Sequence, residues 1–432
     1  MQPPAANRAE SRRAVIAATF GNVLEWYDFS VYAFFAATIG RLFFPSDDPT
    51  ASLLATFAVF GVGFVVRPLG GILIGRMGDR RGRRPALVLT IMLMAAGTVM
   101  IGLLPTYAAI GAAAPALLVL ARLLQGFSAG GEWGGSTAFM VEWAPEGRRG
   151  WYGSFQQMSV AAGMLLGSGV GALVNTVLPP EAVEGWGWRI PFLLGGVLGL
   201  IGQYMRRNVG ETPAYRATEP ASERMAPTAT SAAAGPRAGW ALGARAFGFT
   251  VLWTVSYYIF LNYMPTFTRS QVGLPPDQSL WANTIGLLVL VALIPPMGWL
   301  SDRVGRKPLL LASCGFFALL TWPLLSLMLG SRGEFGTVVL IQLLFGVAIA
   351  LFSGPGPAAI AEIFPTRGRS SWMSASYALA VAIFGGFAPY IATWLIANTG
   401  NPMSPALYVI AAAVVSFLTI AALPETAKRP LA

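Results

Sequence analysis

Five ionisable side chains interrupt long apolar stretches of this 432-residue sequence: Glu25, Asp28, Arg67, Arg122 and Glu132. An ionisable group among apolar residues is costly unless it is paired or solvated, so each is a candidate for a functional site. The sequence contains no histidine. Any proton chemistry near neutral pH must therefore fall to carboxylates such as Glu25 and Asp28.

Asp28 and Arg122 are predicted to lie at the same depth in an apolar layer. At the rise of an α-helix, Asp28 lies ~20 Å and Arg122 ~18 Å from the same face of a layer about 30 Å thick. We expect a proton-coupling pair, which protonation of Asp28, or an anion competing for the guanidinium, would release. The alternative is a static ion pair that only holds two helices together.

Glu25 stands one helical turn from Asp28, and Tyr32 lies one further turn along the same face. Glu25 could handle a proton or a ligand, or it could form structural hydrogen bonds; Tyr32 is a candidate ligand contact. Arg67 and Glu132 fall near the end of the layer at which the first helix starts, which favours a gate at that end. Arg67 could instead bind a ligand carboxylate, for which a guanidinium fork is well suited.

Two further apolar stretches carry polar side chains that could orient a small ligand. They are Gln156 and Gln157 in one stretch, and Tyr257, Tyr258 and Asn262 in another. Such amides and phenols also join helices to each other or anchor them at a membrane surface, so both interpretations remain open.

The elements that must position these residues are twelve apolar stretches. A bilayer core about 30 Å thick needs roughly 20 apolar residues per helix. We expect helices near 14–42, 52–75, 85–104, 114–141, 150–178, 188–205, 241–267, 279–300, 308–329, 336–358, 369–398 and 403–423. Residues 206–240 are rich in Pro, Ala, Ser, Thr and Arg and lack apolar periodicity, which is typical of a linker.

The composition agrees with a multi-pass membrane protein. Only 11% of the residues are charged, 55% are hydrophobic and the mean hydropathy is +0.60, a balance that no soluble domain needs for its core. A single cysteine, Cys314, excludes a disulfide framework. Without histidine or a group of cysteines, we expect no metal site and no catalytic residue.

The basic residues predict the orientation of the chain. With the N-terminus inside, most of the 29 Lys and Arg residues fall in inner segments, only Arg41, Arg189, Arg269 and Arg332 fall outside, and two lie within predicted spans. Both termini are therefore expected in the cytoplasm. Anionic inner-leaflet lipid accounts for the net charge of +10, so a nucleic-acid partner is unnecessary.

A basic motif occurs once in each half of the chain. Gly75–Arg84 and Gly298–Lys307 both follow the pattern G-x-x-x-D-R-x-G-R-[RK], and Glu142 and Glu362 each follow a later repeat. We therefore expect two homologous halves, 1–205 and 241–432, joined by the cytoplasmic linker 206–240. The fold class is an all-α membrane protein with twelve transmembrane helices in two pseudo-symmetric six-helix bundles, and a ligand site at their interface near the midplane.

The repeated motif is also predicted to act as a gate at the cytoplasmic end. Asp79, Arg83 and Glu142, beside Gly75, would form one ion-pair cluster, and Asp302, Arg306 and Glu362 would form a second. We expect the two clusters to latch the outward-open state. The alternative is that these charges only determine topology.

The repeated motif resembles that of the major facilitator superfamily over nearly the whole chain. Gly21–Phe29, Arg67–Gly71 and Leu124–Gly135 resemble its metabolite:proton symporter family. This resemblance implies a transporter that uses the proton gradient and no cofactor, in the inner membrane of a bacterium. Related sugar:proton symporters place an aspartate in the first span and an arginine in the fourth, at the positions of Asp28 and Arg122.

The resemblance implies a substrate that is a small carboxylate or zwitterion. Two buried arginines favour an anion, so we expect import of a small organic acid, such as a di- or tricarboxylate, by proton symport. The alternatives are proton-coupled uptake of a zwitterion or osmolyte such as proline or betaine, and efflux by proton antiport. The partners expected are the substrate, protons and membrane lipid, with the protein as a monomer.

Three further classes are weighed against import. Efflux is disfavoured because residues 161–171 lack the proline that drug-efflux members carry in the fifth span. An enzyme would need a nucleophile with a base, or a metal cluster, and no such constellation occurs. A sensor that binds a ligand without transporting it remains a further alternative.

Overall fold

The computed structural model describes residues 8–81, 83–130, 132–142, 144–207, 236–364 and 369–429, and the regular structure in these ranges is helical. Within these ranges, successive helices follow one another as twelve rods. The first half contains rod 1 (α1, Arg8–Phe34; α2, Ala36–Phe43), rod 2 (α3, Pro49–Val65; α4, Arg67–Arg81), rod 3 (α5, Arg83–Leu103), rod 4 (α7, Ala113–Ser128; α8, Glu132–Glu142), rod 5 (α9, Arg149–Val177) and rod 6 (α11, Arg189–Arg207). Short helices α6 (Tyr107–Ile110), α10 (Pro180–Ala182) and η1 (Val183–Gly187) lie between rods.

The second half has the same number of rods. It contains rod 7 (α13, Pro236–Tyr257; η3, Tyr258–Tyr263; α14, Met264–Phe267; η4, Thr268–Val272), rod 8 (α15, Pro276–Val304), rod 9 (α16, Arg306–Gly330), rod 10 (α17, Phe335–Ser353; α18, Gly356–Ile363), rod 11 (α19, Arg369–Ala380; η5, Val381–Gly385; α20, Ala388–Thr399) and rod 12 (α21, Ser404–Ala422). The all-helical fold and the twelve predicted spans are confirmed, one span to each rod.

Length and apolar composition separate the rods into stronger and weaker membrane spans. Among the described residues, eight helices are long and apolar enough to cross a bilayer, and Val88–Leu103 and Ala113–Ser128 are shorter apolar helices. Helix continues to Arg207 and begins again at Pro236, so the ends of the predicted 206–240 linker are helical. Residues 208–235 lie outside the described part of the chain.

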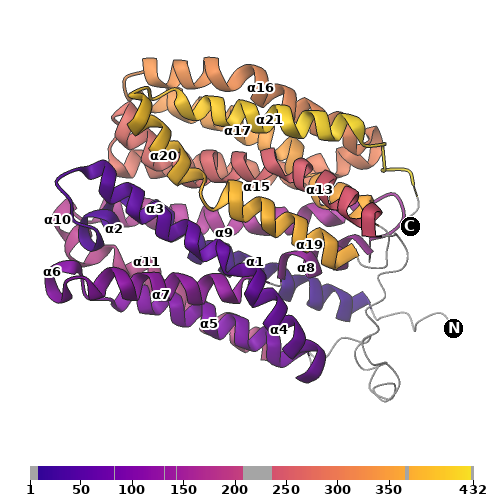
Figure 1. Ribbon diagram of the computed structural model, residues 1–432, viewed down its shortest axis with the longest axis horizontal. Helices are drawn as coiled ribbons and strands as arrows, with labels where there is room; N and C mark the ends of the chain where they lie inside the picture. The colour runs from indigo at the N-terminus through magenta and orange to yellow at the C-terminus, as the bar shows by residue number, and fades with distance from the viewer. Residues whose placement is uncertain are drawn as a thin grey trace.

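The two halves lie side by side along their length, the first coloured indigo to magenta and the second orange to yellow (Figure 1). Rods 5 and 8, formed by α9 and α15, make the most extensive contact between the halves. The start of α1 and the end of α21 lie at the same end of the molecule (Figure 1). We call this end, which also carries Arg149, Arg306 and Glu362, the basic end, and the end with Arg41 and Glu184 the opposite end.

Several rods are interrupted near the middle of the molecule. Rod 2 breaks at Val66, rod 7 widens into the π-helical turn η3, and rod 11 widens into η5. Widened turns often mark functional sites, and broken helices at membrane depth are tolerated where they are buried in protein or line a cavity. The interruptions therefore indicate the region where a ligand would bind.

Close backbone packing brings rods 2 and 4 together. A Cβ atom on Gly126 would overlap the carbonyl oxygen of Gly63, and one on Gly130 would overlap that of Arg67. Only glycine permits this approach. The packing holds Arg67 of rod 2 and Arg122 of rod 4 on neighbouring surfaces.

Candidate functional site

Two buried arginines lie against the same aromatic ring. The guanidinium carbon of Arg67 lies 4.4 Å and that of Arg122 4.9 Å from the ring centroid of Phe29. Arg67 is 7% exposed and Arg122 is fully buried. The ring faces favour both cations, so α1 holds two positive charges close together inside the first half.

Arg67 combines aromatic contacts with one ion pair. Its guanidinium lies 4.3 Å from the Phe64 ring centroid and 5.6 Å from that of Trp26, and its Nη2 lies 3.6 Å from Oε1 of Glu25. Its Nε and Nη2 atoms are buried and have no hydrogen-bond acceptor in the structure. Buried donors are almost always paired in proteins, so Arg67 retains capacity to bind the oxygen atoms of a ligand.

Arg122 is instead held by a chain of hydrogen bonds. Its Nη2 donates to the carbonyl oxygen of Phe60 (3.3 Å) and its Nη1 to Oε1 of Gln125 (2.9 Å). Gln125 then donates to the Thr98 hydroxyl (2.8 Å), which itself donates to the carbonyl oxygen of Met94 (3.0 Å). The side chains of Thr98 and Asp28 both lie against Gly195. The direct Asp28–Arg122 contact expected from their shared depth is absent between these two described residues. Depth along a helix does not fix the direction in which a side chain points. The Arg122 guanidinium instead donates to Gln125, which lies on the same face of the helix.

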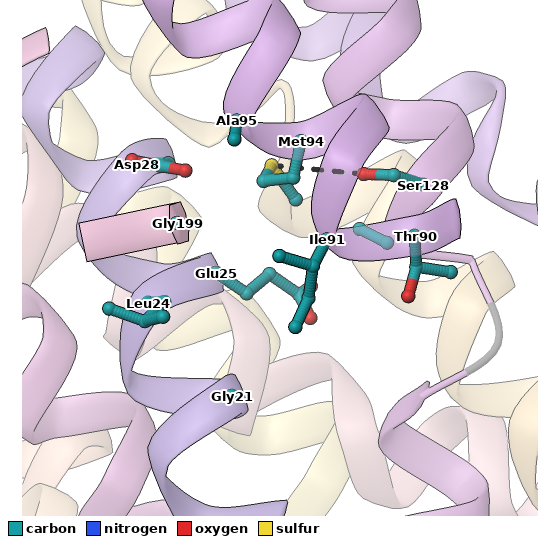
Figure 2. Close-up of a pocket in the computed structure, with 11 residues that line it drawn as sticks. Gly21, Leu24, Glu25, Asp28, Thr90, Ile91, Met94, Ala95, Ser128 and Gly199 are labelled. Carbon is teal, nitrogen blue, oxygen red and sulfur yellow. Dashed lines mark hydrogen bonds between the residues drawn. The ribbon is translucent and has the colours of Figure 1, made fainter. Parts of the chain in front are cut away.

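Asp28 and Glu25 border a small internal cavity within the first half (Figure 2). Asp28 is 4% exposed, and its Oδ1 atom has no hydrogen-bond donor. The cavity has a volume of about 30 Å³, enough for about two water molecules. Its wall includes Thr90, Met94 and Ser128. The two carboxylates are thus joined by a space that water can occupy.

The predicted ligand contacts on rods 5 and 7 are buried and incompletely hydrogen-bonded. Polar atoms without a partner occur on Gln156, Gln157, Tyr257, Tyr258 and Asn262. The Tyr258 ring, from the second half, contacts two rings of the first half. Its centroid lies 5.3 Å from that of Phe64 and 6.2 Å from that of Trp26. Tyr258 therefore lies next to the rings that surround Arg67.

Tyr32 has a different environment from the other predicted ligand contacts. Its hydroxyl donates to the carbonyl oxygen of Thr56 (3.1 Å), and the Arg122 guanidinium lies 4.5 Å from its ring. The Tyr32 hydroxyl is therefore occupied by the backbone of rod 2.

The three predicted gate residues of the second half are in contact at the basic end. Arg306 Nη1 lies 2.7 Å from Oδ1 of Asp302, and Arg306 Nη2 lies 3.4 Å from Oε1 of Glu362. Arg149 of the first half also pairs with Glu362, at 3.0 Å. Asp302 accepts hydrogen bonds from the backbone N–H groups of Gly150 (2.8 Å) and Trp151 (2.9 Å). We call Arg149, Asp302, Arg306 and Glu362 the basic-end cluster; it joins the two halves.

The segment after rod 12 also contacts this cluster through Glu425. Burial opposes ionisation of Glu425, but four backbone N–H groups outweigh it and hold the pKa of its carboxyl below the ordinary value of 4.5. The donors, at 2.9–3.0 Å, are Arg306, Lys307, Thr426 and Ala427. Two of them belong to the first turn of α16, so Glu425 caps that helix.

The corresponding cluster of the first half stays a prediction. The surroundings of Gly75 and the side chains of Asp79, Arg83 and Glu132 lie outside the described part of the structure. Glu142 is described and exposed.

Aromatic contacts cover the central region from both ends. Towards the basic end, the rings of Trp133 and Tyr377 are stacked, with centroids 3.5 Å apart and planes 2° apart. Towards the opposite end, the rings of Phe57 and Tyr263 lie 5.7 Å apart. Each contact joins one half to the other, so the region around Arg67 is enclosed.

Sequence reasoning missed several residues of this region. Gln125 could have been found, because it follows Arg122 by three residues and lies on the same helical face. Thr98, the Trp133–Tyr377 stack and the cap by Glu425 join segments that are far apart in the chain. No pattern in one segment indicates such contacts.

Comparisons with known proteins agree on one family. A family model described as "Sugar (and other) transporter" matches residues 14–234 and 245–432. The glycine betaine/proline/ectoine/pipecolic acid transporter OusA of Dickeya dadantii is 37% identical over 435 residues, covering 97% of this chain and 84% of that protein. A citrate-proton symporter of Salmonella typhi is 36% identical and covers 95% of this chain and 93% of its own.

Two further matches are informative. The alpha-ketoglutarate permease of Escherichia coli is 36% identical over 409 residues, covering 94% of this chain and 92% of that protein. The partially occluded inward-open structure of the xylose transporter XylE from E. coli superposes with a TM-score of 0.80 at 20% identity, covering 98% of this chain and 100% of that chain. At this identity the structural match concerns the fold alone.

Proposed function

Because the chain belongs to the sugar (and other) transporter family of the major facilitator superfamily, and is therefore a transporter and not an enzyme, we propose that it imports a small organic acid by proton symport. The observation that carries this proposal is Arg67, a buried guanidinium with unsatisfied donors beside rings from both halves. A carboxylate is the natural partner for such a fork.

Alternating access follows from the arrangement of contacts between the halves. The basic-end cluster and the Trp133–Tyr377 stack close one side, and the contact of Phe57 with Tyr263 closes the other. Opening one set while the other stays closed would expose Arg67 to one side of the membrane at a time. We place the basic end and both termini in the cytoplasm, in the inner membrane of a bacterium.

Asp28 is the proposed proton carrier, with Glu25 as a second carboxylate on the same cavity. Asp28 and Thr98 lie against the same glycine, Gly195, and Thr98 accepts from Gln125, which holds Arg122. A proton on Asp28 would therefore change the charge beside this hydrogen-bonded chain. Glu25 connects to Arg67 directly. Proton uptake and carboxylate binding would thus act on neighbouring guanidiniums, which couples the two events.

A second candidate substrate is a zwitterion such as proline or betaine. The rings of Trp26, Phe29 and Phe64 already face one cation, the Arg67 guanidinium. If a substrate carboxylate draws Arg67 aside, the same rings could hold a quaternary or secondary ammonium group. One relative named above is a betaine and proline transporter.

Uptake into proteoliposomes with an imposed inward proton gradient tests both candidates. The panel is citrate, alpha-ketoglutarate, proline and glycine betaine, with xylose as the neutral control. Accumulation of an organic acid that collapses with a protonophore supports the main proposal, and accumulation of a zwitterion alone supports the second. Gradient-driven export would indicate antiport, and ligand binding without flux would indicate a sensor; either result would overturn import.

A further inference from the structure

A second cleft lies at the basic end, away from the aromatic site. It has a volume of about 590 Å³ and is lined by residues from the start of α9 and the end of α15. Arg148, Trp151, Trp299 and Arg303 supply its large side chains, and Asp302 forms part of the wall. This volume is in the range of small-molecule sites, roughly 300–1,000 Å³. The cleft has no part in the transport site described above.

The cleft presents positive charge without a competing anion. Arg148 and Arg303 are exposed, and neither forms an ion pair with a carboxylate among the described residues. Arg303 lies 3.8 Å above the Trp299 ring, which holds the guanidinium in place. The carboxylate of Asp302 is already engaged by Arg306 and by two backbone N–H groups of α9. The local chemistry is therefore that of a phosphate or carboxylate receptor.

An apolar stripe leads from this cleft towards the middle of the bilayer. Leu288, Ala292, Pro296, Trp299 and Arg303 follow each other at helical spacing on α15, and all five are exposed. Leu288 is 58% and Trp299 44% exposed. At the rise of an α-helix, the row from Leu288 to Arg303 spans about 22 Å, of which the apolar part, from Leu288 to Trp299, spans about 16 Å. Apolar residues, then tryptophan, then arginine is the order that a bilayer imposes from its core to its headgroups.

We propose that this cleft binds an anionic phospholipid, with its headgroup phosphate between Arg148 and Arg303 and an acyl chain along the Leu288–Trp299 stripe. The stripe distinguishes a lipid from a free anion, because a free anion would gain nothing from an apolar surface that continues into the membrane. Basic pockets between transmembrane helices on the cytoplasmic side suit such headgroups.

The proposed lipid would also act on the contact between the halves. Arg148 belongs to the first half and Arg303 to the second, so one phosphate between them bridges rods 5 and 8. Asp302, next to Arg303 in the chain, joins the same two rods through the N–H groups of Gly150 and Trp151. A bound anionic lipid therefore stabilises the closed basic end.

Native mass spectrometry of the purified protein, titrated with phosphatidylglycerol in detergent, tests the site. The double variant Arg148→Gln/Arg303→Gln should have an apparent Kd for this lipid about ten-fold or more higher than the wild type, because both guanidiniums proposed to hold the phosphate are lost. Arg245→Gln, which removes an exposed arginine of α13 outside the cleft, should retain it as the wild type does. Phosphatidylethanolamine and inorganic phosphate are run in parallel.

Three outcomes would overturn the proposal. Equal lipid retention by the wild type and the double variant would show that the lipid does not bind between Arg148 and Arg303. An equal loss in Arg245→Gln would show a general charge effect. Displacement of the lipid by millimolar inorganic phosphate would identify a free-anion site. Each variant is also checked for wild-type thermal stability, so that unfolding is not mistaken for lost binding.

Discussion

The two buried arginines differ in how firmly the protein holds them. Arg122 donates to Gln125 and to the carbonyl oxygen of Phe60, so its position is set by the first half alone. Arg67 has one ion pair of 3.6 Å with Glu25 and otherwise contacts aromatic rings. A ligand carboxylate could therefore bind Arg67 without breaking hydrogen bonds of the kind that hold Arg122.

Replacing Arg67 by lysine tests its proposed role. Lysine keeps a cation near Glu25 but lacks the planar fork. Losing one charge-assisted hydrogen bond, worth about 1.5–3 kcal/mol, should raise the apparent KM for the transported carboxylate by about ten-fold or more. Initial uptake rates measure this change. The control Arg269→Lys, at the opposite end of rod 7, should leave KM unchanged; an unaltered KM in Arg67→Lys would argue against carboxylate binding there.

Asp28→Asn tests the proposed proton carrier. Asparagine fits the same volume but cannot take up a proton, so accumulation driven by a pH gradient should be abolished while ligand binding persists. Proteoliposome uptake measures the first property and a ligand-induced rise in Tm measures the second. Asp48→Asn is a matched control, because Asp48 is an exposed helix cap at the opposite end and asparagine caps equally well. Gradient-driven uptake at the wild-type level in Asp28→Asn would show that Asp28 does not carry the coupled proton.

At the scale of helices, glycine sets how closely the two halves approach at the basic end. A Cβ atom on Gly298 of α15 would overlap the carbonyl oxygen of Gly150 and the side chain of Ser154, both on α9. Gly298 opens the second copy of the repeated motif. The motif therefore supplies a close contact as well as charges.

Gly298→Ala should push α15 and α9 apart. Inserting a methyl group into such a packed contact typically destabilises a structure by about 1–3 kcal/mol. Only the state closed at the basic end contains this contact, so the conformational equilibrium should shift towards the state that is open at that end. Distances between spin labels on α9 and α15 measure the shift. Gly315→Ala is the control, because an added Cβ there meets open space. Equal distance distributions in the wild type and Gly298→Ala would contradict this role.

The cap on α16 depends on the charge of Glu425. Its folded-state pKa is below the ordinary value of 4.5, so its contribution is fully present above that value and is lost as the pH falls below it. Glu425→Gln removes the charge and should therefore lower the free energy of unfolding at neutral pH by about 1 kcal/mol, the usual contribution of a helix cap. Thermal unfolding of the two proteins measures the cost. Glu146→Gln, at an exposed glutamate of the same end, should leave Tm unchanged, and a Glu425→Gln variant as stable as the wild type would show that the cap is dispensable.

At the scale of the whole molecule, charge and backbone contacts together join the halves. Asp302 accepts from Gly150 and Trp151 across the interface while it pairs with Arg306 on its own side. Arg149 of the first half also donates across the interface, to Glu362 of the second half. Because these groups are the proposed latch, weakening them should favour the state that is open at the basic end.

Asp302→Asn should open the basic end more often. An amide lacks the charge that favours both the Arg306 pair and the backbone N–H groups. The reporter variant is Ser154→Cys in a Cys314→Ser background, because Ser154 is buried and lies between the halves, against Gly298. In Asp302→Asn, this reporter should react several-fold faster with a thiol reagent. Asp277→Asn, at the other end of α15, provides the control. An unchanged labelling rate in Asp302→Asn would refute the latch.

The sequence by itself determined the helices, their duplication and the family. Apolar stretches of span length leave the chain little alternative to helices in a bilayer, and the repeated basic motif marks the two halves. It also predicted that Asp302, Arg306 and Glu362 meet, because two of them lie one turn apart and the third follows a repeat. The organic-acid substrate and the roles of the site residues stay predictions.

Only the tertiary structure decided which side chains meet across rods. Glu25 pairs with Arg67, and Arg122 is held by Gln125, which donates to Thr98, although depth alone had matched Asp28 with Arg122. Depth follows from counting residues along a helix, whereas the rotation of each rod follows from packing. That packing depends on glycines such as Gly126 and Gly130, whose partners lie on another rod and cannot be identified from their own segment.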